Sequence, residues 1–130
     1  MPLIGKLKYG AVALGMSLMA SHAMAADEGD FLIDTTGDLA ALCGANPEEP
    51  NYSAAIHMCQ GYIIGIAHFH TALAAELKED IYCVPEGDAR PSRNEAVAMF
   101  VDWAGNNPDS AGTEALDGVL NWAAAAFPCK

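Results

Sequence analysis

The sequence predicts an all-α fold, a small antiparallel four-helix bundle stapled by two disulfides. Apolar residues recur at i, i+3 and i+4 in four successive segments, which is the spacing of one helix face. No alternating β-rich runs bounded by turns occur between these segments. The four cysteines are an even number, which in a small exported chain indicates two disulfides.

The first predicted helix is short. Thr35 or Thr36 can cap its beginning, and Gly44 can end it. Its apolar face carries Leu39, Leu42 and Cys43. The loop that follows, residues 44–52 (GANPEEPNY), contains two prolines that exclude a helix there.

The second predicted helix begins after Ser53, which can cap it, and runs to about Lys78. On a helical wheel, one side gathers apolar residues that we expect to face the core. These are Ile56, Cys59, Ile63, Ile66, His70, Leu73 and Leu77, flanked by Tyr62 and Phe69.

A stripe of small residues runs along the same helix and consists of Gly61, Gly65 and Ala72. Each glycine in a helix costs about 1 kcal/mol relative to alanine, so two of them indicate a packing reason. We expect a close contact with another helix or subunit at this stripe. Gly65→Leu would then destabilise the domain by about 1–3 kcal/mol through overpacking.

The last two predicted helices follow the same pattern. Ser92 and Glu95 have the spacing of a capping box that opens the third helix, and Gly105 can close it. Its apolar stripe is Val97, Phe100, Val101 and Ala104. The fourth helix stops at Pro128 and carries Leu116, Val119, Leu120, Ala123, Ala124 and Phe127 at helical spacing.

An antiparallel bundle also predicts how the cysteines pair. Cys43 ends the first helix and Cys59 lies near the start of the second, so both fall at one pole. Cys83 follows the second helix and Cys129 follows the fourth, which places both at the opposite pole. We therefore expect Cys43–Cys59 and Cys83–Cys129.

The N-terminal residues have the three-part pattern of a secretory signal peptide. Lys6 and Lys8 are followed by an apolar run and then by Ala23-Met24-Ala25, which has small residues at both cleavage positions. We expect residues 1–25 to be a signal peptide and residues 26–130 to form one periplasmic domain with no membrane segment after the signal is removed.

The remaining chain is strongly acidic. Without Lys6 and Lys8, four basic residues oppose 17 acidic ones, a formal charge of −13. Nucleic acids and anionic membranes would add like charge, so neither is expected as a partner. A basic protein surface is the natural complement.

Neither a metal site nor a catalytic site is expected, and no cofactor. His68 and His70 are two residues apart and point to different sides of a helix, so they cannot share a metal. His70 is expected to be a hydrogen-bonded core histidine. Ser53 and His57 are four residues apart and could hydrogen-bond, but no G-x-S-x-G elbow accompanies them.

Three segments combine cysteines with glycines, prolines and apolar residues: CQGYIIGIAHFH (residues 59–70), YCVPEG (82–87) and NNPDSAGTEALDGVLNWAAAAFPC (106–129). They resemble the Rap/Tai family of type VI secretion immunity proteins. The resemblance extends from about Asp38 to Cys129 with the cysteines in register. It implies a periplasmic protein that is not an enzyme and that inhibits a peptidoglycan-cleaving effector, often an amidase, by occluding its active site. The alternative is a small periplasmic chaperone or stress-related binding protein, and the sequence leaves a homodimer open.

The partner-binding surface is expected from charge and topology. An up-and-down bundle places loop 44–52 and loop 105–112 (GNNPDSAG) at the same pole. Together they offer Glu48, Glu49, Tyr52, Asn106, Asn107 and Asp109 to a cationic toxin or effector. The basic residues Lys78, Arg90, Arg93 and Lys130 are expected near the other pole.

Overall fold

A computed structural model of the protein describes residues 26–130. Its four helices are α1 (Thr36–Cys43), α2 (Tyr52–Leu77), α3 (Arg93–Asn106) and α4 (Ala115–Ala126), with short 3₁₀ turns at Asp30–Leu32, Gly87–Ala89 and Pro108–Ser110. Within residues 26–130 there is no strand, only an isolated bridge between Thr35 and Glu114. The predicted all-α bundle is confirmed, whereas the expected signal peptide lies outside the described residues.

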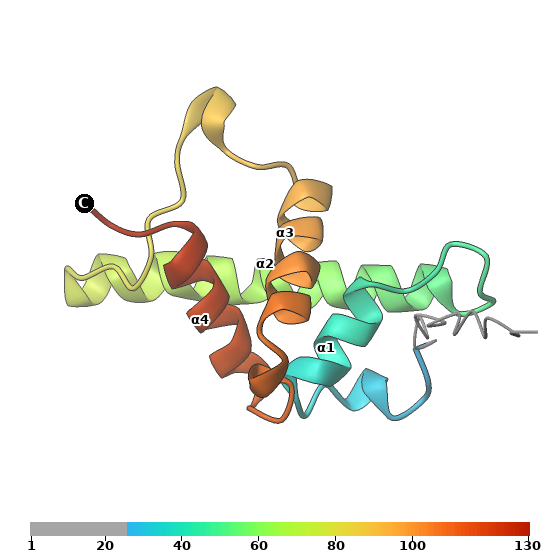
Figure 1. Ribbon diagram of the computed structural model, residues 1–130. Helices are drawn as coiled ribbons and strands as arrows, with labels where there is room; N and C mark the ends of the chain where they lie inside the picture. Colours follow the sequence, from blue (N-terminus) through green and yellow to red (C-terminus); the bar gives the residue numbers. More distant parts are fainter. Residues whose placement is uncertain (1–25) are drawn as a thin grey trace, which may run out of the picture.

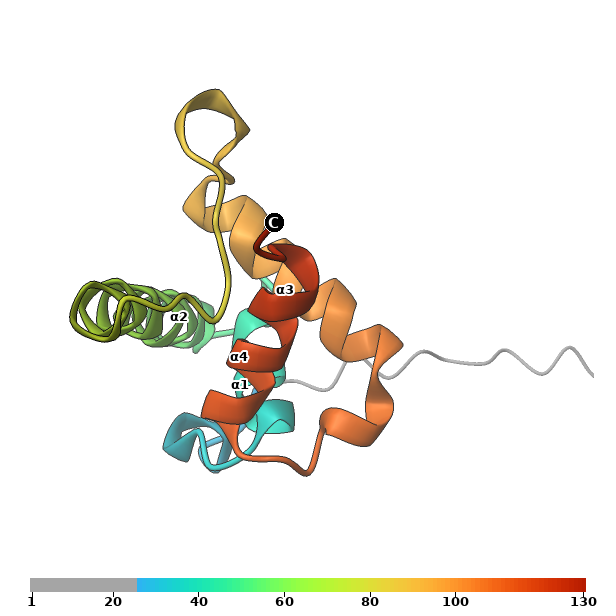
Figure 2. The same ribbon diagram turned by 90° about the vertical axis from the view of Figure 1, so that its left-hand side faces the viewer.

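Helix α2 lies across the other three helices (Figure 1). Viewed nearly along the axis of α2, the helices α1, α3 and α4 all lie to one side of it (Figure 2). Only one side of α2 is therefore covered by the rest of the chain. This steep crossing, rather than four parallel axes, determines where the loops lie.

Helix α1 begins as its sequence predicts. The Asp38 N–H donates to Thr35 Oγ1 at 3.1 Å, and the Thr35 N–H donates to Asp38 Oδ2 at 2.8 Å, which is a capping box. Leu39 and Leu42 are fully buried. Because α1 contacts each of the other three helices, this short element forms the centre of the core.

Asn51 holds the N-cap position of α2 without a side-chain cap hydrogen bond, so the prediction that Ser53 caps this helix was wrong and Ser53 lies in its first turn. Lys78 follows the last turn in the left-handed region at φ 58°. Cys59, Ile63 and His70 are buried as predicted. Placing Phe69 and Leu77 at the core was wrong, since they are 66 % and 64 % exposed. Phe69 lies on the side of α2 that the other helices leave uncovered. The C-terminal part of α2 extends beyond the helices that pack against it (Figure 1), so its last residue, Leu77, is not covered by them.

Helices α3 and α4 complete the core. The Ser92–Glu95 capping box is confirmed, and α3 ends one residue later than predicted. The fully buried Phe100 packs edge-on against Trp122 of α4, with ring centroids 5.5 Å apart. Leu116, predicted to face the core, is 44 % exposed, while Trp122 was not predicted and is 4 % exposed.

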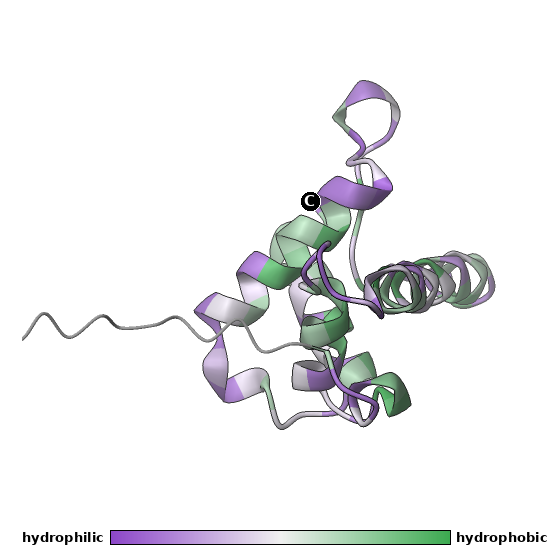
Figure 3. Ribbon diagram, turned by 90° about the vertical axis from the view of Figure 1, so that its right-hand side faces the viewer, coloured by the Kyte–Doolittle hydropathy of each residue, from purple (hydrophilic) through white to green (hydrophobic). Residues whose placement is uncertain are grey.

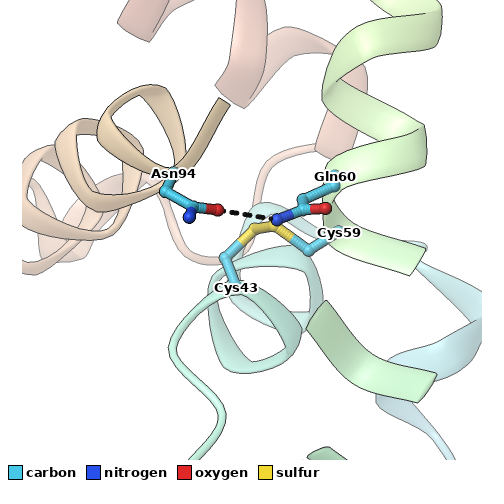
Figure 4. Close-up of a disulfide and its surroundings, with 4 residues drawn as sticks. All are labelled: Cys43, Cys59, Gln60 and Asn94. Atoms are coloured by element: carbon cyan, nitrogen blue, oxygen red, sulfur yellow. Dashed lines mark hydrogen bonds between the residues drawn. A yellow bond between two sulfur atoms is a disulfide. The ribbon is translucent and has the colours of Figure 1, made fainter. Parts of the chain in front are cut away.

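Both predicted disulfides are present. Cys43–Cys59 joins the end of α1 to the second turn of α2 (Figure 4). Beside it, Gln60 Nε2 donates to Asn94 Oδ1 at 3.0 Å and links α2 to α3. Cys83–Cys129 joins the segment after α2 to the end of the chain.

The predicted close contact at the glycine stripe is absent from the described chain. Gly61, Gly65 and Ala72 are exposed, and a Cβ built on either glycine would meet no atom within 4 Å. The prediction that Gly65→Leu overpacks against another helix of the same chain was therefore wrong, because this side of α2 faces away from α1, α3 and α4. The alternative, a contact with another subunit at this stripe, stays a prediction.

Candidate functional site

The first predicted contact loop lies between α1 and α2. Glu48 is exposed and Glu49 is half-buried. Asn46 organises the loop, since its Oδ1 accepts from the Glu48 N–H and its carbonyl oxygen accepts from the Glu49 N–H, both at 3.0 Å. Tyr52 follows as the first residue of α2 and is half-buried.

The second predicted contact loop lies between α3 and α4. Asp109 is exposed, as are Asn106 and Asn107. The two amide side chains are already engaged, because Asn106 donates to the Asp102 carbonyl at 2.9 Å and Asn107 to the Trp103 carbonyl at 2.8 Å. They satisfy carbonyl groups at the end of α3.

The structure does not bring these two loops to one pole as expected. The second loop is bound to the beginning of α1, where the Thr36 N–H donates to the Thr113 carbonyl and the Gly37 N–H to the Ala111 carbonyl. The first loop begins at the other end of α1. The eight residues of α1 therefore separate the two acidic loops by about 12 Å of helix.

The basic residues of the described chain lie away from both loops. Lys78 follows α2, and Lys130 follows the disulfide-bonded Cys129. Arg93 begins α3, and Arg90 precedes it by three residues. These segments occupy a different side of the molecule from residues 44–52 and 107–113 (Figure 1). In Figure 3 the first turn of α3 is hydrophilic, in contrast with the middle of α3, and the segment between α2 and α3 is of mixed character.

The open side of α2 carries the predicted stripe of small residues together with exposed apolar side chains that the sequence analysis did not place there. From Tyr52 to Ala75, 24 successive residues include no Asp, Glu, Lys or Arg, in a chain with 17 acidic residues. On this side lie Met58, 44 % exposed, and Phe69, 66 % exposed, with the two glycines between them. The absence of charge along the helix was the available signal.

His70 has the predicted structural role. Its Nε2 accepts from the Ile81 N–H at 3.1 Å, and its ring stacks on Tyr82 with centroids 3.9 Å apart. Burial raises the pKa of the Tyr82 phenol. The pKa of Tyr62 is raised by burial and, to a smaller extent, by the negative charge of Glu114. The His70 contacts fix the segment after α2 onto the C-terminal half of that helix.

The Ser53–His57 pair does not have the geometry of an activated nucleophile. His57 Nδ1 lies 2.7 Å from the Ser53 carbonyl oxygen and 3.4 Å from Ser53 Oγ. A carbonyl can only accept, so Nδ1 carries the hydrogen and cannot take the proton of the serine. The pair is a local contact on the exposed side of the first turns of α2.

Residues 26–130 show neither a metal-binding cluster nor a membrane-spanning helix. No group of three or more His, Cys, Asp or Glu side chains in this range could hold a metal ion. No helix in the same range is both long enough and apolar enough to cross a membrane.

A family model described as Rap1a immunity proteins matches residues 35–129. The match covers well over half of the chain. The chain belongs to the Rap1a immunity protein family. The Rap1a match begins at Thr35, the capping residue of α1, and ends at Cys129, so it contains all four helices and both disulfides. Neither the curated proteins nor the solved structures gave a match.

Membership of this family confirms the resemblance to type VI secretion immunity proteins that the sequence motifs indicate. It supports a type VI immunity protein whose partner is a cognate toxin or effector. The two disulfides agree with an exported protein, since disulfides persist in oxidising compartments.

Proposed function

We propose that this Rap1a protein protects the cell that makes it by binding a type VI effector in the periplasm and occluding its active site. The effector class that we propose is a peptidoglycan-cleaving amidase. The family match over residues 35–129 is the observation that carries this proposal. A binding role without turnover also agrees with the Ser53–His57 geometry, which lacks an activated nucleophile.

Charge and rigidity support inhibition by direct contact. A net charge of −11 for the full chain favours encounter with a cationic cleft and raises the association rate more than it strengthens the bound state. Two disulfides hold the loops on a fixed helical scaffold, so little conformational entropy is lost on binding. We propose Glu48, Glu49 and Tyr52 as one contact, and Asn106, Asn107 and Asp109 as a second, about one α1 length away.

The test requires a candidate effector, for which we would take a cell-wall hydrolase or secreted protein encoded next to the gene of this protein. Purified effector is assayed on isolated peptidoglycan with increasing amounts of the immunity protein, and the release of cleaved fragments is measured. The proposal requires loss of activity at stoichiometric ratio and survival of cells that express both proteins in the periplasm. Undiminished cleavage at saturating immunity protein, with a complex still formed, would exclude active-site occlusion.

The open side of α2 favours a second candidate, a small periplasmic chaperone. Met58 and Phe69 on this side, and Leu77 at the end of the helix, expose apolar surface of the kind that binds partly unfolded clients. A chaperone would suppress the aggregation of an unrelated heat-denatured protein, and Phe69→Ser would weaken that effect. An immunity protein would bind one effector and leave the unrelated protein to aggregate.

A further inference from the structure

A cavity of about 320 Å³ lies between α2, α3, α4 and the segment that joins α2 to α3. Its volume falls at the lower end of the roughly 300–1,000 Å³ typical of small-molecule sites. The walls are mostly apolar, with Ile63 from α2, Val84 from the joining segment, and Val119, Trp122 and Phe127 from the C-terminal part of the chain. It is separate from both acidic loops.

The wall formed by the joining segment is fixed at several points. The Cys83 N–H donates to the Phe127 carbonyl at 2.8 Å, and Cys83 is disulfide-bonded to Cys129. Tyr82, which lines the cavity, is 5 % exposed and is stacked on His70. A cavity with such a wall is formed before any ligand arrives, which lowers the entropic cost of binding.

The charge of the cavity lining is opposite to that of the chain. Arg90 and Arg93 line the cavity together with His68, and no Asp or Glu is part of the lining. Only four basic residues lie outside the predicted signal peptide, and two of them line this one cavity. In the full chain, 17 acidic residues oppose 6 basic ones. Asp80 and Glu86 line a neighbouring cavity that shares Arg90, whereas Arg93 lines only the first of the two.

We infer that this cavity binds an aliphatic monocarboxylate, with its hydrocarbon chain against Trp122 and Val119 and its carboxylate at Arg90 and Arg93. Apolar walls with a few convergent polar groups at the rim are the usual pattern of such sites. The guanidinium groups supply charge-assisted hydrogen bonds to a carboxylate, and a cation of the same length would be repelled. The inference about this cavity does not depend on the proposed inhibition of an effector, and a separate binding experiment tests it.

The probe is sodium octanoate, and the reporter is the fluorescence of Trp122. The chain has two tryptophans, and Trp103 does not line this cavity, so Trp103→Phe isolates the signal of Trp122. We expect a saturable change with octanoate and a much weaker one with octylammonium or octan-1-ol. Isothermal titration calorimetry on the unsubstituted protein provides a second, label-free measurement of the same binding.

The variants separate the carboxylate contact from general charge. Arg90→Gln with Arg93→Gln should weaken octanoate binding about tenfold or more, because hydrogen bonds to charged groups are lost. Lys78→Gln with Lys130→Gln removes the same charge outside the cavity lining and should leave the affinity unchanged. Ala96→Leu narrows the cavity from α3 and should abolish binding, with circular dichroism showing that the fold is retained. Octanoate binding that is absent, or that is equally strong for octylammonium and insensitive to both arginine substitutions, would overturn the inference.

Discussion

The side chain of Thr36 occupies the space that a Cβ atom on Gly118 would need. A Cβ built on Gly118 would lie 2.6 Å from Thr36 Cγ2, well inside van der Waals contact. Thr36 is fully buried, and its Oγ1 donates to the Glu114 carbonyl at 3.1 Å and lies 2.9 Å from Thr113 Oγ1. The first turn of α1 therefore packs directly on the backbone of α4.

Gly118→Ala should destabilise the protein by about 1–3 kcal/mol, because Thr36 cannot move away without losing its hydrogen bonds. Guanidinium unfolding followed by circular dichroism measures the change. A variant as stable as the parent would show that α1 and α4 can separate slightly at no cost.

Gly61→Ala and Gly65→Ala should have the opposite effect. Neither added Cβ meets an atom of the described chain, and alanine is a better helix former than glycine by about 1 kcal/mol per site. The double variant should unfold at a higher denaturant concentration than the parent. A loss of stability in dilute protein would reveal a neighbour that covers this side of α2.

Reversing the charge of the first acidic loop, Glu48→Lys with Glu49→Lys, should slow association with the effector about tenfold at low salt. Asp109→Lys alone changes one charge at the other end of α1 and should have a smaller effect. Glu76→Lys with Glu79→Lys is the matched control, since it changes the net charge equally at exposed positions near the end of α2. Stopped-flow mixing with the effector gives the rates, and equal slowing by the control pair would mean that only net charge matters.

Glu95 should make the stability of α3 sensitive to acid. Hydrogen bonds with the side chain and the backbone of Ser92 hold the pKa of the Glu95 carboxyl below its ordinary value of 4.5. A group with a lowered pKa in the folded state stabilises fully above its unfolded pKa, and this stabilisation is lost as the pH falls through the folded pKa.

Glu95→Gln keeps an acceptor for the Ser92 N–H but cannot ionise, so the difference in stability between parent and variant should shrink as the pH falls below 4.5. Urea unfolding across this pH range measures the difference. A constant difference at all pH values would show that the charge of Glu95 contributes nothing.

Local signals in the sequence predicted most of the fold. The capping residues of α1 and α3 lie within a few positions of the helix that they begin, so the sequence alone locates them. The pairing of Cys43 with Cys59 and of Cys83 with Cys129 required only the order and direction of the helices.

Contacts between elements were harder to predict. A helical wheel shows which residues share one side of a helix, but it does not show which side other helices cover. The predictions that Phe69 faces the core and that Gly65 contacts another helix were wrong for this reason. The true close approach is at Gly118, whose partner Thr36 is distant in sequence. An antiparallel bundle with nearly aligned helix axes predicts both acidic loops at one pole, whereas α2 crosses its neighbours steeply (Figure 2).

The position of Cys129 sets an order for oxidation. It follows its partner Cys83 by 46 residues, whereas Cys43 and Cys59 are only 16 residues apart and both precede Cys83. In a chain that enters an oxidising compartment N-terminus first, this early pair can close while Cys129 has not yet emerged. Once Cys43 and Cys59 have paired, Cys83 has no thiol to join until Cys129 follows it 46 residues later. Vectorial delivery thus guards against mispairing, a safeguard that the fully reduced chain lacks when it refolds in a test tube.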